Sequence, residues 1–214
     1  MRTWRSRPGG SEGPAERLVA ELRVHVDDER VLDAIGAVPR DRFVPARLQE
    51  EAWDNCALPI GSGQTISQPL VVARMCELLA LRGGDQVLDV GTGSGYHAAV
   101  LAQLAAHVWS IELHPELSER AGRSLAAAGV ENVTLLGGDG RRGHREAAPY
   151  DAINVAAAMD AIPGELCAQL REGGRLVGPV DAGDQRLVLL RRTAHGFERS
   201  AHERVRFVPL VPGP

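Results

Sequence analysis

The sequence has 214 residues, of which 44% are hydrophobic, 24% charged and 4% aromatic. This length suits one α/β domain with additions rather than two full domains, and the composition excludes fibrous, low-complexity and disordered chains. The 24 Lys and Arg residues and 28 Asp and Glu residues give a net charge of −4, which argues against nucleic acid or an anionic membrane as the main partner.

The cysteines are odd in number, far apart and without metal-ligand spacing. We therefore expect reduced thiols in a cytoplasmic protein, and no metal site. No apolar run approaches the roughly 18 residues that a membrane-spanning helix needs. Residues 1–14 lack the apolar core of a signal peptide and predict a disordered tail. Residues 15–214 are interpreted as a single domain, with helices and a loop in 15–82 and a ligand-binding core in 83–214.

The N-terminal part predicts helices separated by a long connection. Apolar residues at helical spacing indicate a first helix from about Ala15. Asp27 is expected to cap a second helix, which ends before Pro39. Residues 40–64 contain several Pro and Gly residues and predict an irregular, loop-rich connection. A further helix is expected to begin at Pro69.

From residue 83 onward, short β-rich runs alternate with helices expected to begin near Tyr96, Pro115 and Pro163. This alternation predicts right-handed βαβ units and a doubly wound, Rossmann-like α/β fold with helices on both faces of a mostly parallel sheet. An antiparallel pair of strands is expected to close one edge. The predicted strands are residues 86–90, 107–113, 132–136, 150–156 and 175–180 in the parallel part, and 185–192 and 204–210 in the edge pair.

The strongest functional signal is the run VLDVGTGSG from Val87 to Gly95, in which a predicted strand enters a glycine-rich loop that opens a helix. Glycines let a ligand approach bare backbone, and the helix N-terminus presents free N–H groups. A dinucleotide loop would need glycine at position 96, which is Tyr96. The spacing G-x-G-x-G is instead similar to the first motif of S-adenosylmethionine-dependent methyltransferases. The expected cofactor-binding residues in this run are Asp89, Gly91, Thr92, Gly93, Ser94 and Gly95.

Acidic residues follow the next two predicted strands. Glu112, with Leu113 beside it, ends the second strand, where a carboxylate can accept both ribose hydroxyls. Asp139 and Gly140 end the third strand and are expected to meet the adenine end. The alternative for both carboxylates is a solvated position at a loop entry. Together with the loop spacing they favour S-adenosylmethionine, with S-adenosylhomocysteine as product, over a pyrophosphate that Asp89 would repel.

Four motifs are spread along the chain: V-P-R-x-x-F-V-P at residues 38–45, L-P-I-G-x-G-Q-T-I-S-Q-P at 58–69, D-x-G-T-G-S-G-Y at 89–96 and V-R-F-V-P-L at 205–210. Together they closely resemble the protein-L-isoaspartate O-methyltransferase family. The resemblance extends from about residue 15 to 211. The T-I-S-Q-P loop makes it specific, because that loop is not a general feature of methyltransferases.

The resemblance implies a cytoplasmic, mostly monomeric repair enzyme that methylates the free carboxylate of L-isoaspartyl residues in damaged proteins and peptides. The methyl ester then collapses to a succinimide. The resemblance also implies that Ser67 is the active-site residue. The expected substrate-binding residues are Gln64, Thr65, Ile66, Gln68, Pro69 and Val211.

A peptide carboxylate has a pKa of about 4, so the acceptor is already ionised at neutral pH and needs no general base. We therefore expect Ser67 to hold the acceptor and not to form a covalent intermediate. The alternative for Ser67 is that it stabilises the start of the helix entered at Pro69.

Three residues depart from the family pattern. His144 stands where an aromatic residue is expected, Ala156 replaces a Thr after the fourth strand, and Val211 stands where Thr is common. These changes keep open a second hypothesis, the methylation of an aspartate in one dedicated peptide to form an aspartimide. A non-catalytic S-adenosylmethionine-binding module is disfavoured by the intact T-I-S motif, and a nucleic-acid methyltransferase is disfavoured by the acidic charge.

Overall fold

The computed structural model describes residues 13–213, so residues 1–12 of the tail predicted at residues 1–14 lie outside the described part. The first helix, α1 (Pro14–Leu22), begins one residue before the predicted start, and the Glu16 carboxylate accepts a hydrogen bond from the Gly13 N–H at 2.9 Å. The second helix, α2 (Glu29–Ala37), ends before Pro39 as expected. The prediction that Asp27 caps it was wrong, because the Asp28 carboxylate accepts the hydrogen bond from the Arg30 N–H.

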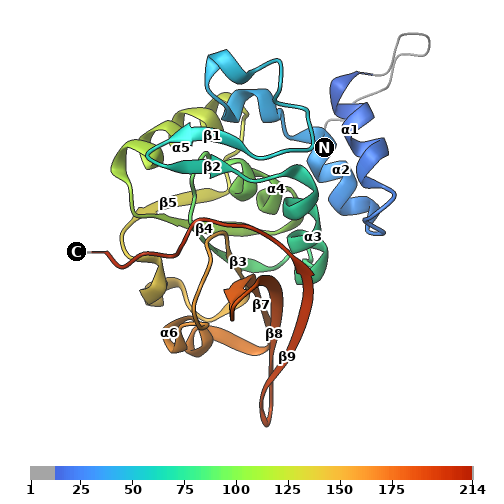
Figure 1. The fold of residues 1–214 in the computed structure, drawn as a ribbon. Coiled ribbons are helices and arrows are strands. Elements are labelled where there is room, and N and C mark those ends of the chain that lie inside the picture. The colour runs from blue at the N-terminus through green and yellow to red at the C-terminus, as the bar shows by residue number, and fades with distance from the viewer. Residues whose placement is uncertain (1–12, 214) are drawn as a thin grey trace.

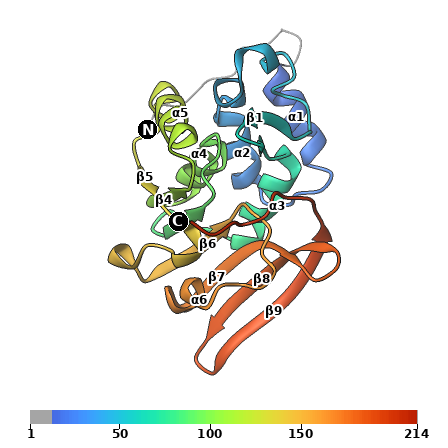
Figure 2. The same cartoon turned by 60° about the vertical axis from the view of Figure 1, so that its left-hand side comes forward.

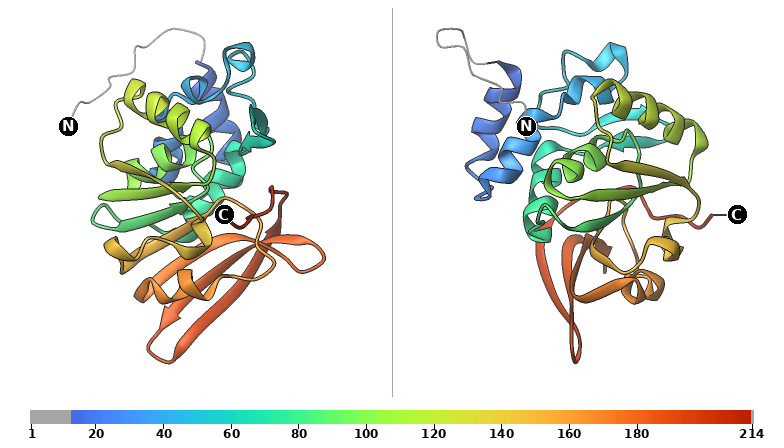
Figure 3. Two further views of the ribbon diagram at one scale, coloured as in Figure 1. Left: turned by 90° about the vertical axis from the view of Figure 1, so that its left-hand side faces the viewer. Right: turned by 180° about the vertical axis from the view of Figure 1, so that it is seen from behind.

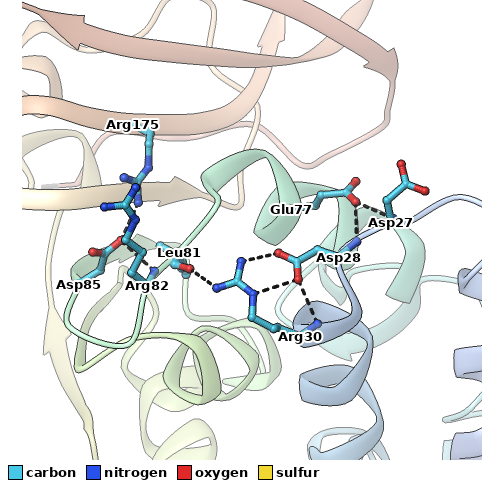
Figure 4. A network of polar contacts seen from close by, with 8 residues as sticks. All are labelled: Asp27, Asp28, Arg30, Glu77, Leu81, Arg82, Asp85 and Arg175. Atoms are coloured by element: carbon cyan, nitrogen blue, oxygen red, sulfur yellow. Dashed lines mark hydrogen bonds and ion pairs between the residues drawn. The ribbon is translucent and has the colours of Figure 1, made fainter.

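The third helix, α3 (Pro69–Leu79), begins at the predicted residue and is joined to α2 by a network of polar contacts. One oxygen of Glu77 accepts hydrogen bonds from the backbone N–H groups of Asp27 and Asp28, at 2.7 and 3.1 Å (Figure 4). The Arg30 guanidinium bridges the Asp28 carboxylate and the Leu81 carbonyl in the same view. These contacts fix the helical N-terminal part against the rest of the molecule.

The connection between α2 and α3 is more regular than predicted. It contains two 3-10 turns, η1 (Arg40–Phe43) and η2 (Ala46–Leu48), and a hairpin of β1 (Leu58–Gly61) and β2 (Gln64–Ile66). The hairpin turn at residues 61–63 uses positive φ angles at all three positions. The strands of this hairpin are too short for an alternating pattern to identify them from sequence.

Within residues 13–213, one seven-stranded sheet has the order β5-β4-β3-β6-β7-β8-β9. Five neighbouring strands, β5, β4, β3, β6 and β7, are parallel to one another, as predicted. β8 and β9 are antiparallel additions at one edge of the sheet. The order reverses between β3 and β6, and ligands bind such sheets outside the carboxyl ends of the strands at this reversal. The strands are β3 (Gln86–Val90), β4 (His107–Glu112), β5 (Val133–Gly137), β6 (Tyr150–Val155), β7 (Leu170–Asp181), β8 (Gln185–Thr193) and β9 (Gly196–Arg204).

Helices cover both faces of the sheet, as expected, but unequally (Figure 3). α3, α4 (Tyr96–Leu104) and α5 (Pro115–Ala127) pack on one face, where α3 contacts β6 and β7 and α4 contacts β4. The short α6 (Gly164–Ala168) contacts β7 on the other face. The sheet residues separate accordingly into two apolar clusters, one with Val87, Val108 and Val177 and one with Leu88, Ile153 and Leu176.

The prediction that residues 204–210 form the last strand was wrong. The partner of β8 is β9 (Gly196–Arg204), whose side chains are mostly exposed and so carry no apolar alternation. Residues 205–210 instead run as an extended segment across the carboxyl edge of the sheet, where the Ala158 N–H donates to the Val208 carbonyl and the Leu210 N–H donates to the Ala158 carbonyl. Figures 1 and 2 show this C-terminal segment in dark red as it leaves β9 and passes the parallel strands.

Candidate active site

The glycine loop follows β3 at the reversal of the strand order. Its conformation requires glycine: Gly91 has φ +94°, and Gly95 has φ +87° and would place a Cβ atom 3.2 Å from the Ala121 Cβ. The Gly91 and Thr92 N–H groups donate to the Ile111 carbonyl at 2.9 and 3.2 Å, which anchors the loop to β4. The loop therefore presents bare backbone to the cleft beside it.

Asp89 lies behind the loop and does not line the cleft. Its buried carboxylate accepts hydrogen bonds from the Ser110 hydroxyl and the Asn154 amide, both at 2.7 Å. The Ser110 hydroxyl in turn lies 2.6 Å from the Thr92 hydroxyl. Burial raises the pKa of Asp89 to about 6, although these two hydrogen bonds act in the opposite direction. Asp89 and Thr92 thus hold the loop from inside the protein.

Glu112 is the acidic side chain that faces the cleft from the end of β4. One of its carboxylate oxygens accepts a hydrogen bond from the Gly93 N–H at 2.7 Å, and the other accepts from the His114 N–H at 2.9 Å. Each carboxylate oxygen has two lone pairs, so both oxygens keep capacity for a further donor. Leu113 lines the cleft next to it.

Asp139 is turned away from this cleft, although its neighbours Gly138 and Gly140 line it. Its carboxylate accepts hydrogen bonds from the Arg141 side chain, with an ion-pair distance of 2.7 Å. The Arg141 guanidinium, opposed in part by burial, holds the pKa of Asp139 well below its usual range. A ligand that reaches Asp139 must therefore share the carboxylate with Arg141.

Ser67 lies where two cavities meet. It lines the cleft beside the glycine loop and also an open groove of about 690 Å³, and Thr65, Phe207 and Val208 line both as well. Within residues 13–213 no hydrogen-bond partner of the Ser67 hydroxyl is found. The hydroxyl is therefore free to bind a ligand at the junction of the two cavities.

The start of α3 does not depend on the Ser67 side chain. Gln68 is the N-cap residue and makes no side-chain cap, while the Asn55 amide oxygen accepts a hydrogen bond from the Leu70 N–H at 3.0 Å. The capping role considered for Ser67 is thus performed by Asn55 from the preceding loop.

The other predicted site residues separate into those that line a cavity and those that support it. Ile66 and Pro69 are buried, and the Ser94 hydroxyl accepts a hydrogen bond from the Tyr96 N–H. Gln68 lines the open groove. The cleft beside the glycine loop is lined by Gln64, Thr65, Gly91, Gly93, Gly140 and Val211.

Sequence reasoning missed part of the cleft wall. Phe207, Val208, Pro209 and Leu210 line it, and they belong to the segment that was predicted as a strand. The available signal was the V-R-F-V-P-L motif itself, whose apolar residues contact the cleft and do not pair in the sheet. Other missed lining residues are Val90, Ile111, His114, Gly138 and Ala157.

The departures from the family pattern fall at different places. Ala156 and Val211 line the cleft, so the changes from Thr lie within reach of a ligand. His144 lies outside it: its N–H donates to the Gln169 side chain at 2.8 Å and its carbonyl accepts from the Tyr150 hydroxyl at 2.6 Å.

The part of the chain that the structure describes contains no group of three or more His, Cys, Asp or Glu residues that could hold a metal ion. In the same residues, no helix has both the length and the apolar character to cross a membrane.

A parallel sheet whose strand order reverses at a glycine loop, with a carboxylate at the end of the next strand, is typical of Rossmann-like nucleotide-binding domains. The loop spacing G-x-G-x-G, with Tyr96 where a dinucleotide loop needs glycine, indicates the S-adenosylmethionine-dependent methyltransferase class. The particular family follows from comparison with known proteins. The model of the protein-L-isoaspartate(D-aspartate) O-methyltransferase family matches residues 14–213, and the chain belongs to this family.

Relatives and solved structures agree with this assignment. The protein-L-isoaspartate O-methyltransferase of Erwinia tasmaniensis is 50% identical over 94% of this chain and 97% of its own length, and that of Vibrio atlanticus is 48% identical over 95% and 98%. A solved protein-L-isoaspartate O-methyltransferase has a TM-score of 0.83 at 28% identity over 91% of this chain, which spans 65% of that protein. A Plasmodium falciparum structure in complex with S-adenosyl-L-homocysteine has a TM-score of 0.82 at 22% identity, over 94% of this chain and 99% of that one, and supports the fold alone.

Proposed function

We propose that this protein transfers the methyl group of S-adenosylmethionine to the free carboxylate of L-isoaspartyl residues in damaged proteins and peptides, which initiates repair through a succinimide. The observation that carries the proposal is the position of Ser67 between the glycine-loop cleft and the open groove. The cleft can hold the methyl donor while the groove admits a peptide, so donor and acceptor would meet at this residue.

The residues of the cleft suit an adenosyl ligand. The wall at Gly91, Gly93 and Gly140 consists of backbone, which leaves room for close approach, and the Glu112 oxygens have lone pairs for two ribose hydroxyls. When bound, S-adenosylmethionine supplies a methyl group attached to a sulfonium cation. Leu113 and Ile111 form apolar wall beside Glu112, which suits a base or a ribose face.

The acceptor end needs positioning more than acid–base chemistry. An isoaspartyl carboxylate is ionised at neutral pH, so no residue has to remove a proton before the attack. We assign to the Ser67 hydroxyl the donation of a hydrogen bond to this carboxylate. Thr65 and Phe207, which line both cavities, would limit the access of water and hold the peptide at the junction.

The test is a pair of short peptides with one sequence, one containing an isoaspartyl residue and the other aspartate. After incubation with the enzyme and S-adenosylmethionine, mass spectrometry should detect a methyl ester or the derived succinimide on the isoaspartyl peptide only. Methylation of neither peptide would refute the proposal. Methylation of the aspartyl peptide alone would favour the dedicated-peptide hypothesis, which the relatives of this chain do not favour.

We further propose that the enzyme acts as a monomer in the cytoplasm, without nucleic acid or a membrane as partner. The net charge of −4 supports the last part of this proposal, since a nucleic-acid or anionic lipid surface attracts basic proteins. Light scattering of the purified protein tests the monomer directly, and a dimer mass would contradict it.

A further inference from the structure

Arg40 is a buried cation next to residues 64–67, which we call the acceptor loop. It lies in the 3-10 turn η1 and its side chain is 0% exposed. The guanidinium binds backbone carbonyl groups: one nitrogen donates to Ala52, and another donates to Cys56 at 2.9 Å and to Ser67 at 3.1 Å. The nitrogen that donates to Ala52 also lies 3.5 Å from the Asp54 carbonyl oxygen.

The charge of Asp54 acts on this guanidinium, but within the described residues no carboxylate contacts it directly. Among residues 13–213 Arg40 forms no ion pair, and its Nε has no hydrogen-bond partner. Its nearest aromatic neighbour is Tyr96, whose ring centroid lies 5.6 Å from the guanidinium carbon. Burial lowers the pKa of Arg40, but a guanidinium remains protonated in proteins. Arginine is almost never fully buried unless it is paired, so an unpaired charge at this place calls for an explanation.

The contacts of Arg40 join the two halves of the active site. Through the Ser67 carbonyl it fixes the acceptor loop, and through the ring of Tyr96 it touches the first residue of α4, directly after the glycine loop. The Ala52 and Cys56 carbonyls flank Asn55, which caps α3 next to Ser67. One side chain therefore fixes the backbone on which the Ser67 hydroxyl is carried.

We propose that Arg40 is a positioning residue for the acceptor carboxylate: it fixes Ser67 through the backbone, and its unpaired positive charge behind the acceptor loop favours an anionic ligand at Ser67. This inference rests on the proposed function and deepens it. A carboxylate bound at Ser67 would add a negative charge to that of Asp54, which acts on Arg40 without forming an ion pair with it. In a buried site, such attraction is weakened less by solvent than at the surface.

The charge part of the proposal is tested by binding, with turnover prevented by S-adenosylhomocysteine. Two peptides are compared, one with an isoaspartyl residue and one in which its free carboxylate is replaced by a neutral carboxamide. In Arg40→Gln we expect the Kd of the carboxylate peptide to rise about tenfold or more, while the Kd of the carboxamide peptide and that of S-adenosylhomocysteine change less than about twofold. Arg42→Gln is the matched control, because Arg42 lies in the same turn but donates to the Ala127 carbonyl, away from Ser67.

Equal weakening of both peptides in Arg40→Gln, or an unchanged preference for the carboxylate, would overturn the proposal. Arg40→Lys keeps the charge but cannot bind the Ala52, Cys56 and Ser67 carbonyls together, so it should keep the carboxylate preference while kcat falls at least threefold. If Arg40→Gln does not fold, Arg40→Lys is the variant that tests the inference. Wild-type values of kcat and KM in Arg40→Lys would overturn it. Methylation of the isoaspartyl peptide by the wild-type enzyme is measured first, because its absence would refute the proposed function and not the role of Arg40.

Discussion

His97 is a buried histidine in the first turn of α4, directly behind the glycine loop. The Asn154 amide, which donates to Asp89, also lies 3.2 Å from the His97 Nδ1, so this nitrogen is the acceptor. The other ring nitrogen faces the Cys76 sulfur at 3.7 Å. Burial lowers the pKa of His97 to about 3, and the ring is therefore neutral at neutral pH.

This pKa predicts an acid-dependent loss of stability. The folded-state pKa is below the unfolded value of about 6.5, so unfolding takes up a proton between pH 3 and 6.5. The stabilisation is complete above pH 6.5 and decreases as the pH falls. Between pH 6.5 and 5, the free energy of unfolding of the wild type should fall by about 2 kcal/mol more than that of His97→Asn, as measured by urea unfolding.

Asp89 acts in the opposite direction, because its pKa is raised to about 6 and its ionisation disfavours the folded state as the pH increases. Asp89 is present in both proteins, so its titration contributes to both pH profiles, and the shared Asn154 amide couples it to residue 97. Parallel pH profiles for the two proteins would contradict a neutral, buried His97.

At the residue scale, the sequence predicted those site residues whose chemistry shows in a local motif. Glu112 and the loop glycines could be located because strand ends and glycine spacing carry the information. Arg40 lies in the V-P-R-x-x-F-V-P motif, but its role depends on carbonyl groups at residues 52, 56 and 67, which only the fold brings together. The engagement of Asp139 by Arg141 could not be predicted either, because it depends on the local turn η3 (Gly140–Arg142).

At the scale of elements, the start of α2 gives a test with a matched control in the same segment. Asp28 accepts the hydrogen bond of the Arg30 N–H, whereas the side chain of Asp27 is exposed and points away from the helix (Figure 4). Asp28→Ala should lower the free energy of unfolding by about 1 kcal/mol, the usual value of an N-cap. Asp27→Ala should change it by less than about 0.5 kcal/mol.

Both variants are compared by chemical denaturation under one set of conditions. A larger loss for Asp27→Ala than for Asp28→Ala would contradict the assigned cap. The backbone N–H groups of both residues remain bound to Glu77 in either variant, so the comparison reports on the Asp28 carboxylate, which binds both the N–H and the guanidinium of Arg30.

Most elements could be predicted because their apolar residues repeat with the period of the structure they form. Four of the parallel strands, β3, β4, β6 and β7, are largely buried and contain short apolar runs, whereas β5 at the sheet edge is only partly buried. β9 failed this criterion because most of its side chains are exposed, while the apolar residues 207–210 resemble a strand in sequence but line the cleft. Tertiary contacts, and not local pattern, decided both cases.

At the scale of the whole molecule, the active site is assembled from segments far apart in the chain. The acceptor loop lies at residues 64–67, the glycine loop at 91–95, and the C-terminal segment at 207–211 forms the opposite wall. The N-terminal helices are attached to the sheet through α3, which contacts β6, β7 and β8. We propose on this basis that residues 15–214 form a single domain, as the sequence suggested.

The central claim is that the acceptor carboxylate is held by the Ser67 hydroxyl at the junction of the two cavities. The most direct test is kcat/KM for an isoaspartyl peptide at saturating S-adenosylmethionine in Ser67→Ala. Ser62→Ala is the matched control, because Ser62 lies in the neighbouring hairpin turn and donates to the Glu116 carboxylate at 2.8 Å. A lost hydrogen bond to a charged group predicts a decrease of at least about tenfold in Ser67→Ala, with S-adenosylhomocysteine affinity changed less than about twofold and Ser62→Ala unaffected. A wild-type kcat/KM in Ser67→Ala, or an equal loss of S-adenosylhomocysteine affinity, would contradict the claim.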